Sequence, residues 1–250
     1  MEDRKDVNVT MIILIIILII VGVTLLFLFN KTEGYLIIDK TIVLSKSGNN
    51  IRKVSDYNEN MFKEKYHIVG DFGEMDNIII NRSSTGEWNY MDKDYKSIDV
   101  NNVTLAYSGN FKNVKLADYD FSYYDSSYDS ILKKALGDRD ISKFTYSVRR
   151  SSMDFNGDGK LESIYTLTNV DSAVSKENRY SLIFLESNGK VVTIDEEKEK
   201  EFMVESILDL DNDGKYEVVV NKGALDVSLV DDSYQIYKIN GDSFKCIMNS

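Results

Sequence analysis

The sequence predicts a mainly β protein, in which an N-terminal transmembrane helix precedes a β-rich ectodomain that ends in two copies of one strand-loop-strand unit. Three observations support this prediction: an uncharged apolar run near the N-terminus, many short runs of β-branched and aromatic residues, and an acidic loop that occurs twice. The expected boundaries are a short cytoplasmic tail over 1–10, the span over 11–29, a first ectodomain region over 30–143, and the two copies over 144–200 and 201–250.

The apolar run extends from Met11 to Phe29 and contains no charged side chain. A helix of this length, at about 1.5 Å per residue, is long enough to cross the hydrocarbon core of a bilayer. The run does not end in the small residues that precede a signal-peptide cleavage site. A lipid anchor would need a cysteine near the run, but the single cysteine, Cys246, lies far from it. We therefore expect an uncleaved, single-pass anchor in the cell membrane.

The region that follows the span alternates short apolar runs with Gly, Asn, Asp and Ser, which predicts strands joined by turns. The acidic loop does not occur in this region. Its strands are therefore either degenerate copies of the repeated unit or a separate β-domain packed against the copies. The expected strands are Tyr35–Ile38, Thr41–Leu44, Tyr66–Val69, Asn77–Ile80 and Val103–Tyr107.

One helix is expected near 127–136, at the end of the same region. The helical period places four apolar side chains on one face, and an N-cap is available in Asp125 or Ser126. The four apolar residues are Ile131, Leu132, Ala135 and Leu136.

The acidic loop carries oxygen-bearing side chains at positions 1, 3, 5 and 9, with glycine at position 6 and lysine at position 7. Side chains of this kind in a tight turn, together with the carbonyl of position 7, are the ligands that calcium prefers. A solvated acidic turn is the alternative, since Asp, Asn and Gly also populate turns without a metal. Two copies in the same register favour the metal, so we expect two Ca²⁺ ions. The first copy consists of Asp154, Asn156, Asp158, Gly159, Lys160 and Glu162, and the second of Asp209, Asp211, Asp213, Gly214, Lys215 and Glu217.

The loop differs from an EF-hand, whose bidentate acid stands at position 12 between two helices. Position 12 is Tyr165 in the first copy and Val220 in the second. The residues that follow the loops, Ser163–Thr168 and Val218–Val220, are mostly β-branched or aromatic, so each loop is expected to join two strands.

The pattern D-x-[DN]-x-D-G-x-x-[DE] between two strands resembles the calcium loops of integrin-type FG-GAP and VCBS repeats, which fold as four-stranded blades of β-propellers. The resemblance covers about residues 144–250 and implies that one ion is bound by Asp154, Asn156, Asp158, the Lys160 carbonyl and Glu162, and a second by Asp209, Asp211, Asp213, the Lys215 carbonyl and Glu217. Two features depart from the family. Its ninth ligand is usually aspartate, and a chain without proline has no Phe-Gly…Gly-Ala-Pro motif.

Each acidic loop is followed, after a long connection, by an expected hairpin. The hairpins begin at Tyr180 and Tyr234 and turn at Asn188-Gly189 and Asn240-Gly241, the dipeptide that most strongly predicts a hairpin turn. Each copy thus predicts a propeller-blade-like unit of four strands. Two blades cannot close a propeller of four or more. We therefore expect an incomplete or degenerate β-propeller, or a β-domain plus two blades.

The composition excludes several classes of function. A net charge of −11 argues against nucleic acid, which requires basic surfaces, and a single cysteine excludes an internal disulfide. The only histidine, His67, lies in an expected strand and is interpreted as structural, which leaves no catalytic site based on several histidines. Cys246 is expected to pack as a small apolar residue. The charged run Asp195–Glu201 is expected to be a solvated connection.

The expected location follows from the metal, because calcium is abundant outside cells and scarce in the cytosol. The C-terminal domain is therefore extracytoplasmic, and abundant Lys, Asn and Ile without proline suggest an AT-rich bacterial genome. The leading hypothesis is a binding or scaffolding module of the cell envelope with a protein or polysaccharide ligand. The alternative is an envelope-acting hydrolase with carboxylate catalysis. An exposed aromatic patch favours binding, whereas carboxylates clustered in a deep cleft favour the enzyme.

Overall fold

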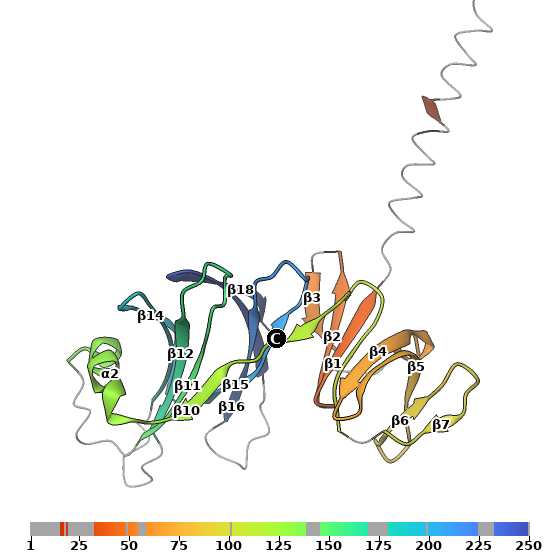
Figure 1. Ribbon diagram of the computed structural model, residues 1–250, viewed down its shortest axis with the longest axis horizontal. Coiled ribbons are helices and arrows are strands. Elements are labelled where there is room, and N and C mark those ends of the chain that lie inside the picture. Colours follow the sequence, from red (N-terminus) through yellow and green to blue (C-terminus); the bar gives the residue numbers. More distant parts are fainter. Residues whose placement is uncertain are drawn as a thin grey trace, which may run out of the picture.

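A computed structural model describes residues 33–48, 50–54, 59–100, 102–138, 146–169, 180–198, 200–224 and 233–249, together with residues 16, 17 and 19 (Figure 1). These residues form a mainly β fold with three antiparallel sheets and few helices, which confirms the expected fold class at that level. In the part of the chain that the structure describes, no helix is long and apolar enough to cross a membrane. The expected span over 11–29 lies outside the described residues except for 16, 17 and 19.

The N-terminal sheet has eight strands in the order β3-β2-β1-β8-β4-β5-β6-β7, so β8 is inserted between β1 and β4. All five strands expected before residue 110 belong to this sheet. It is a single sheet of eight strands, not a set of four-stranded units. Its strands are β1 (Gly34–Ile38), β2 (Ile42–Ser47), β3 (Asn50–Lys53), β4 (Lys65–Gly70), β5 (Gly73–Arg82), β6 (Trp88–Met91), β7 (Ser97–Ile98) and β8 (Val103–Tyr107), with the 3-10 helix η1 (Met61–Lys63) before β4.

The C-terminal half forms two sheets that share one plan, four consecutive antiparallel strands with one short strand added at an edge. The first, called the helix-covered sheet, consists of β10 (Asp120–Tyr123), β11 (Tyr146–Met153), β12 (Glu162–Asn169), β13 (Ser181–Ser187) and β14 (Lys190–Glu197). The second, called the central sheet, consists of β9 (Lys115–Leu116), β15 (Lys200–Asp209), β16 (Glu217–Ala224), β17 (Ser233–Asn240) and β18 (Ser243–Asn249).

The three sheets are stacked, with the central sheet between the other two (Figure 1). One apolar cluster joins the helix-covered and central sheets, through residues such as Ile183 and Phe202. A second joins the central sheet to β1 and β2, for example Ile236 to Leu36. The central sheet therefore buries apolar side chains on both of its faces.

Corresponding residues of the two C-terminal sheets face the same direction. Ile164, two positions after Glu162, packs toward the central sheet, and Val219, two positions after Glu217, packs toward the N-terminal sheet. The central sheet therefore has the same orientation in the stack as the helix-covered sheet. In both, the corresponding face is turned in the direction of the N-terminal sheet.

The expected helix is present and covers the outer face of its sheet (Figure 1). The 3-10 helix η2 (Ser126–Tyr128) leads into α2 (Asp129–Leu136), and the carboxylate of Asp125 caps η2 by accepting a hydrogen bond from the Ser127 N–H at 2.8 Å. Leu132 and Leu136 are buried against β11, β12 and β13, as the helical period predicts. Without α2 this apolar face would be exposed to water.

Both hairpins expected from Asn-Gly are present, but their turns differ by one residue. Asn188 and Gly189 are the two central residues of the first turn and both have positive φ, at 52° and 77°, as a type I′ turn requires. In the second hairpin Asn240 still pairs with Ser243, so Gly241, with a φ of 62°, begins the turn and Asp242 completes it. The hairpin prediction is confirmed, and the position of the second turn is corrected.

The prediction that the charged run Asp195–Glu201 is a solvated connection is wrong. Its first residues belong to β14 and its last two to β15. Lys222, on β16, donates a hydrogen bond to Asp195 at 3.0 Å and also pairs with Glu197. The run was misleading because β14 is an edge strand, where charged residues are common, and its cationic partner is distant in sequence.

The prediction that Cys246 is packed is also wrong, since the residue is exposed. Cys246 lies on β18, the edge strand of the central sheet, and its thiol donates a hydrogen bond to the Met248 carbonyl at 3.1 Å. The pairing of β17 with β18 is shifted by a bulge next to Tyr237, the partner of Cys246. A bulge changes the alternation of faces along a strand, so the sequence pattern misplaces this residue.

Candidate metal centre

The two acidic loops join consecutive strands, as expected. The first loop, residues 154–162, connects β11 to β12, and the second loop, residues 209–217, connects β15 to β16. Gly159 and Gly214 have positive φ, at 83° and 78°, where the chain reverses. Only glycine adopts this conformation without steric cost, so position 6 is fixed by backbone geometry.

The same hydrogen bonds organise both loops. In the first loop, the carboxylate of Asp154 accepts from the backbone N–H of Asp158 at 3.1 Å and of Gly159 at 2.7 Å. In the second loop, Asp209 accepts from Asp213 and Gly214 at 3.1 and 3.0 Å. The aspartate at position 5 also repeats its contact, since Asp158 and Asp213 each accept from the N–H of the following lysine, both at 2.9 Å.

The glutamate at position 9 closes each loop from below. Oε2 of Glu162 accepts from the Phe155 N–H, and Oε2 of Glu217 accepts from the Leu210 N–H, both at 3.0 Å. Both glutamates are buried, and this burial raises the pKa of each carboxyl above its ordinary value, although the backbone N–H lowers it. A charged carboxylate in such a position is unfavourable by itself, and a cation beside it relieves the cost.

The second loop gathers three carboxylates at one point. Ligand oxygens of Asp209, Asp211 and Glu217 lie within 4.8 Å of one another, and within the described ranges this is the one cluster of His, Cys, Asp and Glu that meets this criterion. Oxygen atoms are the only donors in the set, which suits a hard cation such as Ca²⁺ better than a metal that prefers nitrogen or sulfur. The residues of the second loop therefore fit the expected ion.

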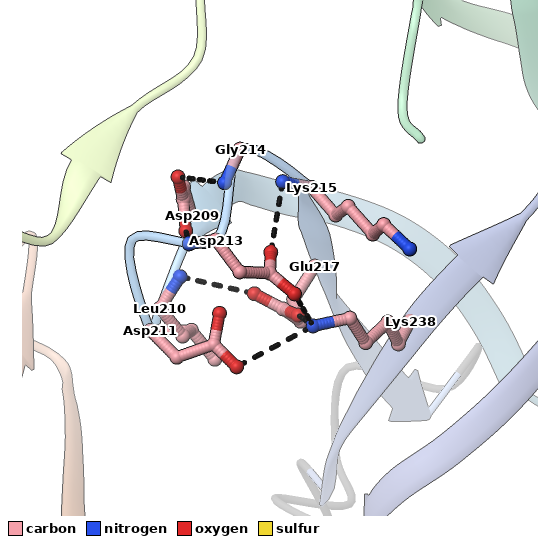
Figure 2. A network of polar contacts seen from close by, with 8 residues as sticks. All are labelled: Asp209, Leu210, Asp211, Asp213, Gly214, Lys215, Glu217 and Lys238. Carbon is pink, nitrogen blue, oxygen red and sulfur yellow. Dashed lines mark hydrogen bonds and ion pairs between the residues drawn. The ribbon is translucent and has the colours of Figure 1, made fainter. Parts of the chain in front are cut away.

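A lysine from outside the second loop, Lys238, lies among the carboxylates of that loop (Figure 2). Nζ of Lys238, on β17, is 2.9 Å from Asp213 Oδ2, 2.9 Å from Glu217 Oε1 and 3.4 Å from Asp211 Oδ2. Its pKa is raised, because these ion pairs outweigh its partial burial. The two acids respond differently: burial dominates at Glu217, whereas at the more exposed Asp213 the contacts with Lys238 and the Lys215 N–H prevail over desolvation and lower the pKa.

Sequence reasoning did not find Lys238, although one signal for it exists. Glu217 is the cross-strand partner of Lys238, and the corresponding partner of Glu162 is Ser187. The residue opposite position 9 on the next strand is thus the position to inspect. The register across a long connection is needed to identify it, and the sequence does not supply that register.

Among the described residues, no lysine contacts the carboxylates of the first loop, and an amide takes its place. Nδ2 of Asn156 donates to Oε1 of Glu162 at 3.1 Å, and Oδ1 of Asn156 accepts from the Asp158 N–H at 2.9 Å. The first loop therefore satisfies its buried glutamate with a neutral donor. The expectation that the Lys160 and Lys215 carbonyls ligate the metal stays a prediction.

The two loops touch each other. The Tyr216 N–H donates to the Phe155 carbonyl at 2.8 Å, which links position 8 of the second loop to position 2 of the first. A Cβ atom on Gly157 would lie 3.3 Å from the Gly214 carbonyl oxygen. Nearby, Lys190 and Asp242 form an ion pair between the two hairpin turns. Both loops and both turns therefore lie at one end of the stacked sheets.

His67 remains a structural residue. Its Nδ1 is 2.7 Å from Asp76 Oδ1, its Nε2 is 3.5 Å from Glu74, and its ring lies 4.8 Å from that of Tyr107. The two acids contact opposite ring nitrogens, so they do not converge on one metal position with the imidazole. This agrees with the interpretation of the lone histidine as part of the fold.

No protein-family model, curated protein or solved structure matches this chain. The resemblance to FG-GAP and VCBS repeats therefore rests on the residues of the two loops.

Proposed function

We propose that this chain is a membrane-anchored, extracytoplasmic calcium-binding protein that serves as a binding or scaffolding module of the cell envelope. The observation that carries the proposal is the duplicated loop, in which carboxylates at positions 1, 5 and 9 make the same hydrogen bonds in both copies. These hydrogen bonds hold the carboxylates of the two copies in the same arrangement, which supports a common ligand over two unrelated acidic turns.

Calcium is the ion that these residues would hold. Asp154, Asn156, Asp158, Glu162 and the Lys160 carbonyl would bind one ion, and Asp209, Asp211, Asp213, Glu217 and the Lys215 carbonyl the other. The ion would supply positive charge beside two buried glutamates, of which Glu162 has neutral donors and Glu217 has Lys238 among the described contacts. Its role is structural, because it holds the connection between two strands of each sheet.

In finer detail, the fold is a short stack of two propeller-blade-like units. This proposal is supported by the four consecutive antiparallel strands of each C-terminal sheet and by their common orientation in the stack. The eight-stranded N-terminal sheet and α2 take the place of neighbouring blades by covering the two outer faces. The residues 11–29 would anchor this stack in the membrane, with the calcium loops on the side where the ion is abundant.

A binding role is favoured by the aromatic surface of β10, the edge strand of the helix-covered sheet. Phe121 and Tyr123 are about half and two thirds exposed, their rings meet edge to face with centroids 5.2 Å apart, and Tyr124 follows them with its ring about half exposed. Exposed aromatic side chains on one strand are typical of a surface that binds protein or polysaccharide.

The hydrolase alternative has one observation in its favour. Asp118, Asp120 and Asp154 line an open depression of about 400 Å³ beside the first loop. The depression is wide rather than deep, and Asp154 is already occupied by backbone N–H groups of its loop. A pair of carboxylates poised for glycoside hydrolysis is therefore less well supported than a binding surface.

The test of the proposed function uses the full chain purified in detergent. Calorimetric titration should detect two calcium ions per chain, and immobilised protein should retain an envelope protein or polysaccharide more strongly in calcium than in chelator. Absence of binding at millimolar calcium would remove the metal from the proposal. Cleavage of an envelope polysaccharide, lost on Asp118→Asn, would favour the hydrolase.

A further inference from the structure

The strongest unexplained feature of the molecule is the position of Lys238. Its ammonium contacts a carboxylate from positions 3, 5 and 9 of the second loop, namely Asp211, Asp213 and Glu217 (Figure 2). These are three of the four side chains that would ligate an ion there. The contacts are made at the oxygens themselves, so lysine and metal require the same atoms.

The ammonium is held in this position by the sheet. Lys238 pairs with Glu217 across β16 and β17, which directs its side chain toward the loop from the neighbouring strand. About a quarter of its side chain is exposed, whereas the side chain of Glu217 is almost entirely buried. An ion pair that is partly shielded from water is stronger than one on the surface.

In the part of the chain that the structure describes, no cation occupies the equivalent place in the first loop. The strand position opposite Glu162 is occupied by Ser187, which is uncharged and too short to reach into the loop as lysine does. Asn156 supplies one neutral donor to Glu162 instead. The two loops thus differ in the charge that the chain itself places on their ligands.

We propose that Lys238 is a built-in cation of the second loop, which competes with calcium for Asp211, Asp213 and Glu217 and makes the first loop the tighter calcium site. This inference rests on the proposed calcium function. It reverses the order expected from side-chain charge alone, in which Asp211 would make the second loop tighter than the first with its neutral Asn156. An ion entering the second loop must displace the ammonium, and the lost ion pairs reduce its net affinity.

The same contacts have a second consequence in the absence of metal. Lys238 neutralises part of the repulsion among the carboxylates of the second loop, so this loop remains formed without calcium. The first loop lacks that compensation and depends more on the ion.

The test compares substitutions at Lys238 with one at a nearby lysine that does not contact the carboxylates. Lys238→Met keeps most of the aliphatic side chain and removes the charge, and Lys238→Arg keeps the charge. Lys245→Met is the matched control, because Lys245 is the cross-strand neighbour of Lys238 on β18, is exposed and lies outside both loops. Each is made in the full chain with and without Asp158→Ala, which removes a ligand of the first loop and isolates the second.

In the Asp158→Ala background, calorimetric titration should show calcium affinity rising roughly tenfold in Lys238→Met, a change that corresponds to the loss of a few exposed or half-exposed ion pairs. Lys238→Arg should show no such rise, and Lys245→Met should change the affinity by about twofold at most, since the Lys245 charge is exposed and screened by solvent. In chelator, Lys238→Met should melt at a lower temperature than the parent, and calcium should abolish this difference.

The outcomes separate this inference from the proposed function. If the first loop binds calcium but Lys238→Met does not tighten the second, Lys238 does not compete and the inference is wrong while the calcium proposal stands. If neither the parent nor any variant binds calcium, both fall together. If Lys238→Met does not fold even in calcium, Lys238→Gln replaces it, because glutamine keeps one neutral donor for Glu217 as Asn156 does for Glu162; unchanged affinity in that variant also overturns the inference.

Discussion

At the scale of single residues, each acidic loop is held together by hydrogen bonds among its own nine residues. Asp154 holds its turn by accepting three backbone N–H groups and Asp209 by accepting two, and Glu162 and Glu217 close the loops from buried positions. Asp158 and Asp213 are different, because both are exposed and accept from only one backbone N–H among the described contacts. Removing either should weaken metal binding, and Asp158, unlike Asp213, makes no ion pair among the described contacts, so its removal should disturb the metal-free fold least.

Asp158→Ala should abolish the stabilisation that calcium gives through the first loop. A ligand that binds only the native state at a hundredfold excess over its dissociation constant stabilises it by about 2.7 kcal/mol. Thermal or urea unfolding of the full chain, with calcium and with chelator, measures this share as the difference between the two conditions.

Asp99→Ala is the matched control, since Asp99 is an exposed aspartate that follows β7, outside both loops. Asp195 does not serve this purpose, because its carboxylate pairs with Lys222. Should Asp158→Ala and Asp99→Ala respond to calcium alike, the first loop is an acidic turn without a metal.

At the scale of elements, the contact between the loops makes them one structural unit. The hydrogen bond from Tyr216 to Phe155 and the close approach of Gly157 to the Gly214 carbonyl join segments that are 55 or more residues apart in the sequence. The helix α2 is the other element on which the arrangement depends, because it covers the face of the helix-covered sheet that no other sheet covers. Each of these contacts can be tested by a substitution with an internal reference.

Gly157→Ala should destabilise the protein more than Gly159→Ala does, by about 1 kcal/mol. Both glycines have positive φ, at 74° and 83°, so both substitutions carry the same backbone strain. Only at Gly157 would the new methyl group press on the other loop, 3.3 Å from a backbone oxygen, whereas nothing lies within 4 Å at Gly159. Urea unfolding of both variants in chelator compares them, and equal losses would show that the loops do not constrain each other.

Leu132→Ala should lower the free energy of unfolding by about 2–5 kcal/mol, the range for leucine removed from a packed core. Leu132 is fully buried between α2 and its sheet. Lys133→Ala, on the exposed side of the same helix, should change stability little. Far-UV circular dichroism during urea unfolding measures both, and a small effect of Leu132→Ala would mean that α2 is not needed to cover the sheet.

At the scale of the whole molecule, the stacking order covers the faces of the two C-terminal sheets without closing them into a propeller. The central sheet is covered on one face by the helix-covered sheet and on the other by β1 and β2 of the N-terminal sheet. The stack therefore ends in a helix on one side and in the eight-stranded sheet on the other. The acidic loops lie at one end of the strands, and Leu210 of the second loop belongs to the apolar cluster shared with β1 and β2.

Protein from its native host should fractionate with membranes and retain Met11, because the run that ends at Phe29 has no exit site for signal peptidase. Protease added to intact, wall-stripped cells should remove the C-terminal domain. Mass spectrometry of the N-terminus and immunoblotting of the C-terminus make the two measurements. A soluble form that begins near Thr32 would refute the anchor, and protection of the C-terminus would refute the orientation.

The sequence by itself determined the features that depend on neighbours within about ten positions. The acidic loops, the strands beside them, the hairpin at Asn188-Gly189, and α2 with the capped η2 before it follow from local geometry, because side-chain period, turn glycines and capping residues act over short distances. The Asn-Gly dipeptide does not fix the exact position of the turn. In the second hairpin Asn240 still belongs to the strand, and the turn begins one residue later, at Gly241.

Only the tertiary structure decided which distant residues meet. It placed Lys238 among the carboxylates of the second loop, Lys222 against Asp195, and the Tyr216 N–H on the Phe155 carbonyl. It also showed that the region before residue 110, expected as degenerate copies or a separate β-domain, forms one eight-stranded sheet, and that α2 covers the outer face of the helix-covered sheet. These contacts depend on strand register across long connections and on which faces are buried together, and those are set by the packing of the whole chain rather than by any local pattern.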